Sequence, residues 1–186
     1  MIIDLVSMRE DDYQFRSPGY YIRAASQPFE ARGAAALRHR VFVEEQKIFA
    51  EHDRDEIDLI ATHLVALSTY AGEADQIVGT VRIHEEEPGL WWGSRLAVDR
   101  DFRHVHRLGT ELIRLAVSTA NGRGADTFLA HVQMQNVPLF ERMHWRVLEE
   151  ADLHGVPHAR MQVDLSRYPA CANPEEGWFR PVRRAA

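Results

Sequence analysis

Residues 94–113 are the stretch best suited to chemistry, because an apolar run leads through a basic loop into an amphipathic helical pattern. The first N–H groups of a helix have no partners within it and carry partial positive charge, so such a loop favours phosphate or pyrophosphate. Gly109 would let an anion approach the backbone closely, and Arg103 and Arg107 would add charge-assisted contacts. An ordinary strand-to-helix connection with solvated arginines would carry the same residues.

The histidines are the natural candidates for metal ligands, and the chain has 10 of them. His104 and His106 share one loop, whereas His154 and His158 are separated by Gly155-Val156-Pro157, which breaks any helical face. A metal site needs three or four ligands, and neither pair has a third one nearby in the sequence. We therefore expect no metal.

Composition narrows the function classes. The net charge of -6 argues against nonspecific nucleic-acid binding, which needs a basic surface. Cys171 is the single cysteine, which excludes an internal disulfide framework. No apolar run approaches the roughly 20 residues of a membrane span, and the acidic N-terminus does not read as a signal peptide. We expect a globular protein of the cytoplasm with neither a membrane nor a nucleic-acid partner.

The elements that must position the basic loop begin with a short strand and a helix. Apolar spacing predicts the helix over 29–46, although residues 41–43 would equally suit a strand. The charged segment 51–58 is expected to be an exposed loop or short helix, and 85–87 a hairpin turn. Strands are expected over 20–24, 63–67, 77–83 and 90–98.

After the basic loop, the period of the pattern becomes helical up to Asn121-Gly122. The strand expected over 127–132 follows a crossover, which favours parallel pairing with 90–98. Further elements are a helix over 138–143 and strands over 145–148 and 159–165. The prediction is an α/β (α+β) fold with a mixed sheet flanked by helices, divided into an arm (1–19), a domain (20–165) and a tail (166–186).

The basic loop resembles the phosphate-binding motif of the GNAT superfamily of acyl-CoA-dependent N-acetyltransferases. That motif reads Arg/Gln-x-x-Gly-x-Gly/Ala and is followed by a helix. Aligned on Gly109 and on the apolar pair Leu112 and Ile113, His104 takes the Arg/Gln position and Arg107 takes the first glycine position. The match is degenerate, and it implies that Arg107 reaches over the phosphates where other members use bare backbone.

Two further stretches carry the resemblance across residues 20–165. The sequence VFVEEQ at 41–46, followed by an acidic loop and HLVA at 63–66, is similar to the N-terminal half of one GNAT branch. Residues 136–145 are similar to the last family motif, Asn-x-x-A-x-x-F-Y-x-x-x-G-F. The resemblance implies a mostly antiparallel GNAT-like sheet with a splayed pair of strands.

The resemblance also implies an acyl-CoA cofactor, with acetyl-CoA as the expected one. Backbone groups of Leu96 and Val98 would pair with the pantetheine arm, and Arg103 would serve the role that His104 cannot. The strand over 127–132 would splay from that over 90–98 and open a cleft for the thioester. The expected cofactor-binding residues are Leu96, Ala97, Val98, Arg103, His104, Val105, His106, Arg107, Leu108, Gly109, Thr110, Asn136 and Phe140.

Proton transfer is where the chain departs from the family. Acyl transfer needs a deprotonated amine and a proton for the leaving thiolate. Many members supply that proton from a tyrosine, but this position is Phe140, which has none to give. His131 is a candidate acid or base because histidine titrates near neutrality, and a structural histidine would fit there as well. The expected catalytic residues are Glu44, Glu86 and His131, with Glu45 a further acid at the cleft.

The expected reaction is transfer of the acetyl group of acetyl-CoA to a primary amine of a small molecule by direct attack, in a monomer or a homodimer. An alternative is an acyl-homoserine-lactone synthase, which a pattern of Arg38, Phe42, Asp55, Asp58, Arg82, Ser94 and Arg95 resembles. Trp92 and Ile48 depart from that pattern. A noncatalytic CoA-binding module is the third reading. The expected substrate-binding residues are Arg38, Phe42, Arg82 and Trp92.

Overall fold

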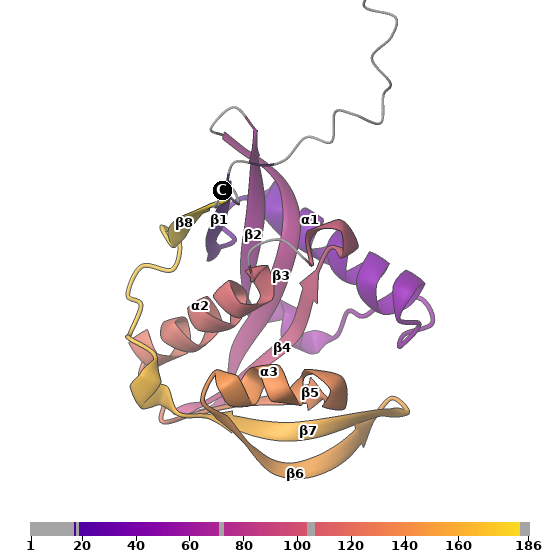
Figure 1. Ribbon diagram of the computed structural model, residues 1–186, viewed down its shortest axis with the longest axis vertical. Coiled ribbons are helices and arrows are strands. Elements are labelled where there is room, and N and C mark those ends of the chain that lie inside the picture. Colours follow the sequence, from indigo (N-terminus) through magenta and orange to yellow (C-terminus); the bar gives the residue numbers. More distant parts are fainter. Residues whose placement is uncertain (1–16, 18, 71–72, 104–106, 183–186) are drawn as a thin grey trace, which may run out of the picture.

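The computed structural model describes residue 17 and residues 19–70, 73–103 and 107–182. Eight strands form one sheet in the order β6-β7-β5-β4-β3-β2-β1-β8 (Figure 1). All described neighbouring strands pair antiparallel except β4 and β5, which are parallel as the crossover predicted. The strands are β1 (Gly19–Ala24), β2 (Thr62–Tyr70), β3 (Glu73–Glu87), β4 (Leu90–Val98), β5 (Thr127–Gln133), β6 (Trp145–Leu153), β7 (Val156–Val163) and β8 (Trp178–Pro181).

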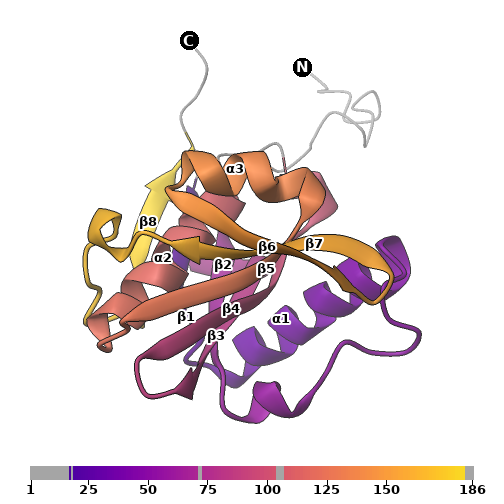
Figure 2. The same ribbon diagram turned by 90° about the horizontal axis from the view of Figure 1, so that it is seen from below.

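Helices cover both faces of the sheet. Figure 2 shows α1 (Pro28–His39) on one face and α2 (Leu108–Gly122) with α3 (Val137–Arg142) on the other. Each face therefore has its own apolar core. The smaller core joins α1 to β2 and β3, and the larger one joins α2 and α3 to the rest of the sheet. This arrangement confirms the mixed, mostly antiparallel GNAT-like fold expected from the sequence.

The helix α1 continues as a π-helix over Arg40–Glu45, so residues 41–43 are helical rather than a strand. Pro28 occupies the first turn, where its missing N–H costs nothing, and Gln27 and Glu30 form a capping box. Leu37, Val41 and Phe42 are buried against the sheet from this face. The π-helical segment therefore brings Phe42 over the middle of the sheet.

The β4 and β5 strands separate halfway along their length. Their pairing runs from Leu90↔Thr127 to Gly93↔Ala130 and then stops, so both strands continue without each other as a partner. Beyond this point β4 carries a bulge against β3, where Thr80↔Ala97 and Arg82↔Ser94 leave one extra residue on β4. Arg95 has a φ of 54°, a left-handed conformation within the bulge. The splayed strand pair predicted from the sequence is therefore present.

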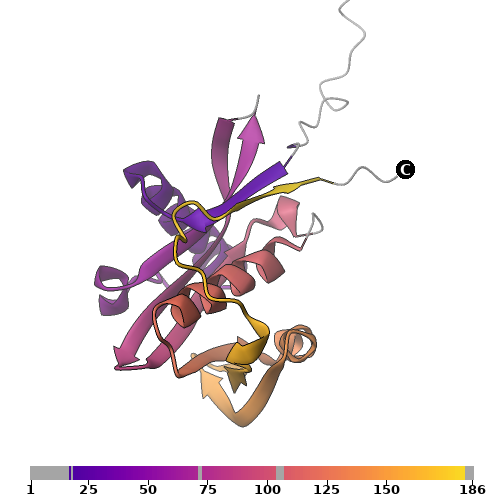
Figure 3. The same cartoon turned by 90° about the vertical axis from the view of Figure 1, so that its left-hand side faces the viewer.

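Two segments differ from the sequence expectations. The acids at 85–87 belong to β3, because the turn is formed by Pro88-Gly89 with φ 77° at the glycine. The sequence predicts a separate tail over 166–186, yet β8 within it pairs antiparallel with β1 from Gly19↔Pro181 to Ile22↔Trp178. Figure 3 shows this yellow segment passing α2 to reach β1. A four-residue strand held through its backbone leaves too short a pattern to detect.

Candidate functional site

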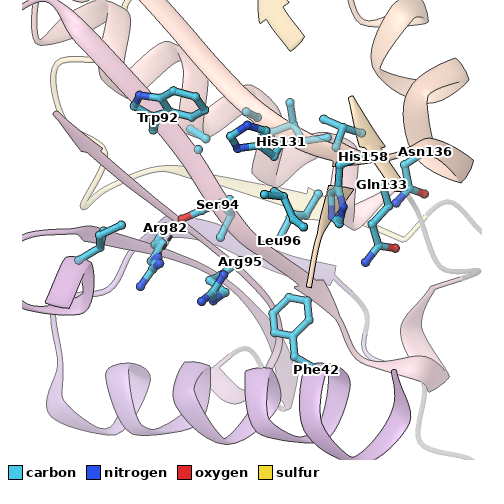
Figure 4. Close-up of a pocket in the computed structure, with 18 of the residues that line it drawn as sticks. Phe42, Arg82, Trp92, Ser94, Arg95, Leu96, His131, Gln133, Asn136 and His158 are labelled. Carbon is cyan, nitrogen blue, oxygen red and sulfur yellow. Dashed lines mark hydrogen bonds between the residues drawn. The ribbon is translucent and has the colours of Figure 1, made fainter. Parts of the chain in front are cut away.

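A cavity of about 470 Å³ opens where β4 and β5 separate. Side chains from both faces of the sheet line it, so the cavity reaches through the gap between the two strands. Figure 4 shows Leu96 between a group with Arg82, Ser94 and Arg95 and a group with His131 and His158. The α1 side of the cavity, here called the polar side, carries its charged side chains together with apolar ones such as Phe42 and Phe49, whereas the side towards α2 and α3 is apolar.

The floor of the polar side is a cluster of three arginines and three aspartates, Arg38, Arg82, Arg95, Asp53, Asp55 and Asp58, here called the Arg–Asp cluster. Arg82 is 1% exposed. Its guanidinium lies 2.5 Å from Asp55 Oδ1 and 2.8 Å from Asp58 Oδ1, and its Nε donates to Ser94 Oγ at 2.8 Å. The cluster carries equal numbers of opposite charges, which is how buried ions are tolerated.

The segment 51–58 was expected to be an exposed loop or short helix, and it is mostly exposed with a 3-10 helix over Glu56–Leu59, but Asp53 is buried in the Arg–Asp cluster. Asp53 is 3% exposed and accepts from Arg38 Nε at 2.6 Å. Hydrogen bonding from Arg82 lowers the pKa of Asp55. Burial alone would raise the pKa of Asp58, but hydrogen bonds from Arg38, the Asp55 backbone and Arg82 lower it overall. The loop is charged because it supplies counter-ions to arginines from α1, β3 and β4.

Two imidazoles flank Trp92 on the polar side. The His131 ring stacks on the Trp92 ring at 5.0 Å between centroids, and His84 lies opposite Trp92 in the β3–β4 register. Burial is the main cause that lowers the pKa of both imidazoles, so both are neutral at pH 7. His84 is 8% exposed, and its Nδ1 has no hydrogen-bond partner among the described residues. Glu86, at the rim, accepts from Trp92 Nε1 at 2.7 Å.

The start of α2 lies beside the end of β4. Arg107 caps the helix in the left-handed conformation, with φ 56° and ψ 33°, and makes no ion pair with any described residue. Among the described atoms, a Cβ built on Gly109 would meet Val98 Cγ2 at 3.8 Å and no other atom within 4 Å. Packing against the described residues therefore does not require a glycine here. Arg103 instead pairs through its guanidinium with Glu45 and donates from Nε to the Val98 carbonyl at 3.1 Å.

Comparison with known proteins decides the family. Residues 20–145 match the acetyltransferase (GNAT) family, which is more than half of the chain. The chain belongs to the GNAT family. A curated relative, the uncharacterized N-acetyltransferase YjcF of Bacillus subtilis (strain 168), is 31% identical over 137 residues, which span 73% of this chain and 93% of the relative. The protein is accordingly an acyltransferase.

Solved structures place this GNAT protein in the same fold. A putative N-acetyltransferase from Lactobacillus plantarum is 25% identical, with a TM-score of 0.69 over 78% of this chain and 98% of that one. A CoA-dependent acyl-homoserine lactone synthase, BjaI, solved with SAM and isopentyl-CoA, is 20% identical. Its TM-score is 0.63 over 79% of this chain and 84% of that one, a likeness of fold.

The cavity of this GNAT protein gathers eight of the residues predicted from the sequence. They are Phe42, Arg82, Glu86, Trp92, Leu96, His131, Asn136 and Phe140. Val98, Arg103, Arg107, Leu108, Gly109 and Thr110 lie at the end of β4 or around the start of α2 instead. His104, Val105 and His106 lie outside the described residues, as do residues 1–16 of the predicted arm.

Three predicted site residues lie elsewhere. Arg38 is 3% exposed and lies beneath the cavity, where Asp53 and Asp58 hold its guanidinium. The Glu44 side chain is 60% exposed and pairs with His39 at 3.1 Å, away from the cavity lining. Ala97 is buried in the core beneath α1. A helical pattern shows which residues face the sheet. It does not show which of those side chains reach the cavity and which are buried beneath it.

Sequence reasoning missed His84, Phe49 and the role of Arg95. His84 alternates with Arg82 and Glu86 along β3, and that period of two could have indicated a shared face. Arg95 lies over the Phe49 ring at 4.7 Å, and its place on the polar side depends on the β4 bulge. A bulge shifts every later side chain to the other face, and its position left no signal in the sequence.

The described part of the chain has no helix long and apolar enough to cross a membrane. Within the same residues, no group of three or more His, Cys, Asp or Glu side chains is arranged to hold a metal ion. His154 and His158 both line the cavity, but the His158 ring contacts the Val156 carbonyl and the His154 ring packs against Phe49.

Proposed function

We propose that this protein transfers the acyl group of an acyl-CoA, of which acetyl-CoA is the simplest, to a primary amine of a small molecule. The observation that carries this proposal is the cavity through the β4–β5 gap, together with the N-terminus of α2 beside the end of β4. Location in the cytoplasm and assembly as a homodimer stay predictions.

The residues at the start of α2 fit a CoA pyrophosphate. Gly109 leaves room that no packing contact demands, and the first N–H groups of a helix of 15 residues attract an anion. Arg107, without an ion-pair partner among the described residues, would supply a positive charge to the phosphates. Arg103 has a weaker claim, because Glu45 already binds its guanidinium. Backbone groups of Leu96 and Val98 would hold the pantetheine arm.

When bound, an acyl-CoA supplies a thioester that an amine can attack. The chain must then remove a proton from the incoming ammonium. We assign this role to His131, which is the first β5 residue after its pairing with β4 ends, on the polar side of the cavity. Burial and the neighbouring His158 lower its pKa, so the ring is neutral and able to accept a proton at pH 7.

Glu86 is suited to attracting the acceptor. The Arg–Asp cluster is balanced in charge, whereas Glu86 is an exposed carboxylate at the cavity rim, oriented by the Trp92 indole at 2.7 Å. A cationic amine would meet this negative charge first. Phe42, Arg82 and Trp92 would shape the acceptor site, and Arg38 would support it from below through Asp58.

A single substitution tests the cofactor site. Gly109→Ala should raise the free energy of unfolding by up to ~1 kcal/mol, because alanine is the better helix former and its Cβ meets no close atom. The same methyl group should block the phosphates and weaken CoA binding at least tenfold in isothermal titration. S-adenosylmethionine serves as the comparison ligand. Undiminished CoA binding by a stabilised Gly109→Ala variant would refute the assignment.

The catalytic assignment is tested with a screen of small primary amines, following the CoA thiol released from acetyl-CoA. His131→Gln should remove the rise of kcat/KM with pH that reports a base, and His84→Gln is the matched control on the other side of Trp92. Loss of that rise in His84→Gln alone would transfer the role to His84. CoA binding without turnover of any amine would favour a binding module.

A further inference from the structure

The part of the cavity beyond the β4–β5 gap is an apolar chamber. Its lining comes from β3, β5, β6, α2 and α3, and every side chain in it is 7% exposed or less. The residues are Val81, Ile113, Ala116, Val117, Phe128, Ala130, Val132, Phe140 and Trp145, here called the apolar chamber. An opening that reaches side chains as deeply buried as Val117, at 0%, extends into the protein interior.

The chamber exists because the strands separate above small residues. Gly93 and Ala130 form the last β4–β5 pair, and Ala116 faces the same space from α2. Protein interiors are normally close-packed, and unfilled apolar space in a core costs stability. Water is a poor occupant of such space, since it needs about two to four polar partners and the chamber residues offer one side-chain N–H, that of Trp145. The natural occupant is an apolar group.

The chamber is placed for one part of the donor. Under the proposed function, the pantetheine arm follows Leu96 and Val98 and brings the thioester to the gap between the strands. The acyl chain attached to the thioester carbonyl carbon would then enter the chamber between α2 and β5. An acetyl group has a single methyl beyond the carbonyl and would contact few of these side chains. Phe140, edge-on to Trp145 at 5.1 Å, keeps the wall free of hydroxyl groups.

We propose that the preferred donor is a CoA thioester with an acyl chain longer than acetyl, seated in the apolar chamber. The inference rests on the proposed function and adds the acyl class to it. Each methylene moved from water into an apolar site tightens binding by roughly fourfold. Two further methylenes, from acetyl to butyryl, should therefore tighten it by about 15-fold.

Calorimetric titration of the full chain with CoA, acetyl-CoA, butyryl-CoA, hexanoyl-CoA and palmitoyl-CoA tests this directly. We expect Kd to fall from acetyl to butyryl or hexanoyl and to rise again for palmitoyl, when the chain outgrows the chamber. Equal affinity for CoA and all its thioesters would overturn the inference and leave the CoA site intact. No binding of CoA itself would overturn the proposed function, and the inference with it.

A matched pair of variants tests whether the acyl chain lies in the apolar chamber. Ala116→Val adds two methyl groups inside the chamber and should lower butyryl-CoA affinity to near that for acetyl-CoA, with CoA binding unchanged. Ala120→Val is the control, because Ala120 is fully buried one turn along α2 but does not line the cavity. It should destabilise the fold without changing the butyryl-to-acetyl ratio. Equal butyryl-to-acetyl affinity ratios in the two variants would mean that the acyl chain binds outside the apolar chamber. Ala130→Val is the second probe if Ala116→Val does not fold.

Discussion

Replacing Arg107 by glycine should make the protein more stable while weakening its hold on CoA. Arg107 has φ 56° and ψ 33° at the N-cap of α2. The left-handed conformation costs a residue with a Cβ about 1–2 kcal/mol and costs glycine almost nothing. Glycine loses about 0.5–1 kcal/mol of this gain through the entropy of the unfolded chain. The net stabilisation is about 0.5–1 kcal/mol, or roughly 2 °C in Tm for a domain of this size.

The binding side of the same substitution has the opposite sign. A hydrogen bond to a charged group contributes about 1.5–3 kcal/mol, and the exposed position of Arg107 favours the lower limit. A loss of about 1.4 kcal/mol corresponds to a tenfold rise in Kd for CoA. Arg107→Gly should therefore unfold at a higher temperature and bind CoA about tenfold more weakly.

Two further variants separate strain from charge. Arg107→Ala keeps the left-handed strain and removes the guanidinium, so it should weaken CoA binding without any gain in Tm. Arg100→Ala removes an equal charge from the exposed turn before the loop and should leave Kd within about twofold. Calorimetry and thermal unfolding measure both effects. Wild-type CoA affinity in Arg107→Gly would refute a phosphate role for the side chain, and an unchanged Tm would refute the strain argument.

Three other perturbations have expected outcomes. Arg82→Met removes the guanidinium that two aspartates share, at a site 1% exposed, and leaves the Arg–Asp cluster with one more negative than positive charge. Urea unfolding should show a loss of about 3–5 kcal/mol, and a loss under about 1 kcal/mol would contradict the view of a coupled cluster. Phe140→Tyr places a hydroxyl in the apolar chamber, so Tm should fall with no gain in kcat, whereas a large gain would mean that the missing tyrosine limits the natural enzyme. Burial lowers the pKa of His63 and His84 below 6.5, so the unfolded chain binds protons that the folded one excludes. The stability that these two neutral imidazoles contribute is complete above pH 6.5 and is lost as the pH falls through their folded pKa values. Tm should therefore drop between pH 7.5 and 5.5. The drop should be smaller in His84→Phe, which has one imidazole fewer.

The elements proposed to bind the cofactor were largely predictable because their signals are local. The change of period after residue 107 predicted α2, and the strand–helix–strand order predicted the parallel β4–β5 pair. The position of Arg107 at a family glycine agrees with its left-handed backbone, since glycine is the residue that adopts this conformation freely. Local chemistry and backbone geometry indicate the same site here.

The polar side of the cavity was harder to predict because its members meet only through tertiary packing. Asp53 reads as one of many acids in a solvated loop, and nothing near it in sequence announces the buried Arg38 that it pairs with. Arg95 points to the polar side because of one extra residue in β4, and a bulge changes the facing of a strand without a change of composition. His84 draws attention because its buried Nδ1 has no hydrogen-bond partner among the described residues. That property depends on the surrounding fold, so the sequence alone could not show it.

The C-terminal strand contacts the helix that is proposed to bind the phosphates. Glu111 lies in the first turn of α2, and its Oε2 accepts from Trp178 Nε1 and from Arg180 Nε, both at 3.0 Å. The Arg180 guanidinium offsets the charge of a carboxylate close to Gly109 that would otherwise repel phosphate, and the Trp178 indole adds a neutral hydrogen bond. A chain shortened at residue 165 would lose both donors, together with the cover over the β1 edge. Under the proposed function, the last strand supplies a remote counter-charge to the phosphate site, although none of its residues lines the cavity.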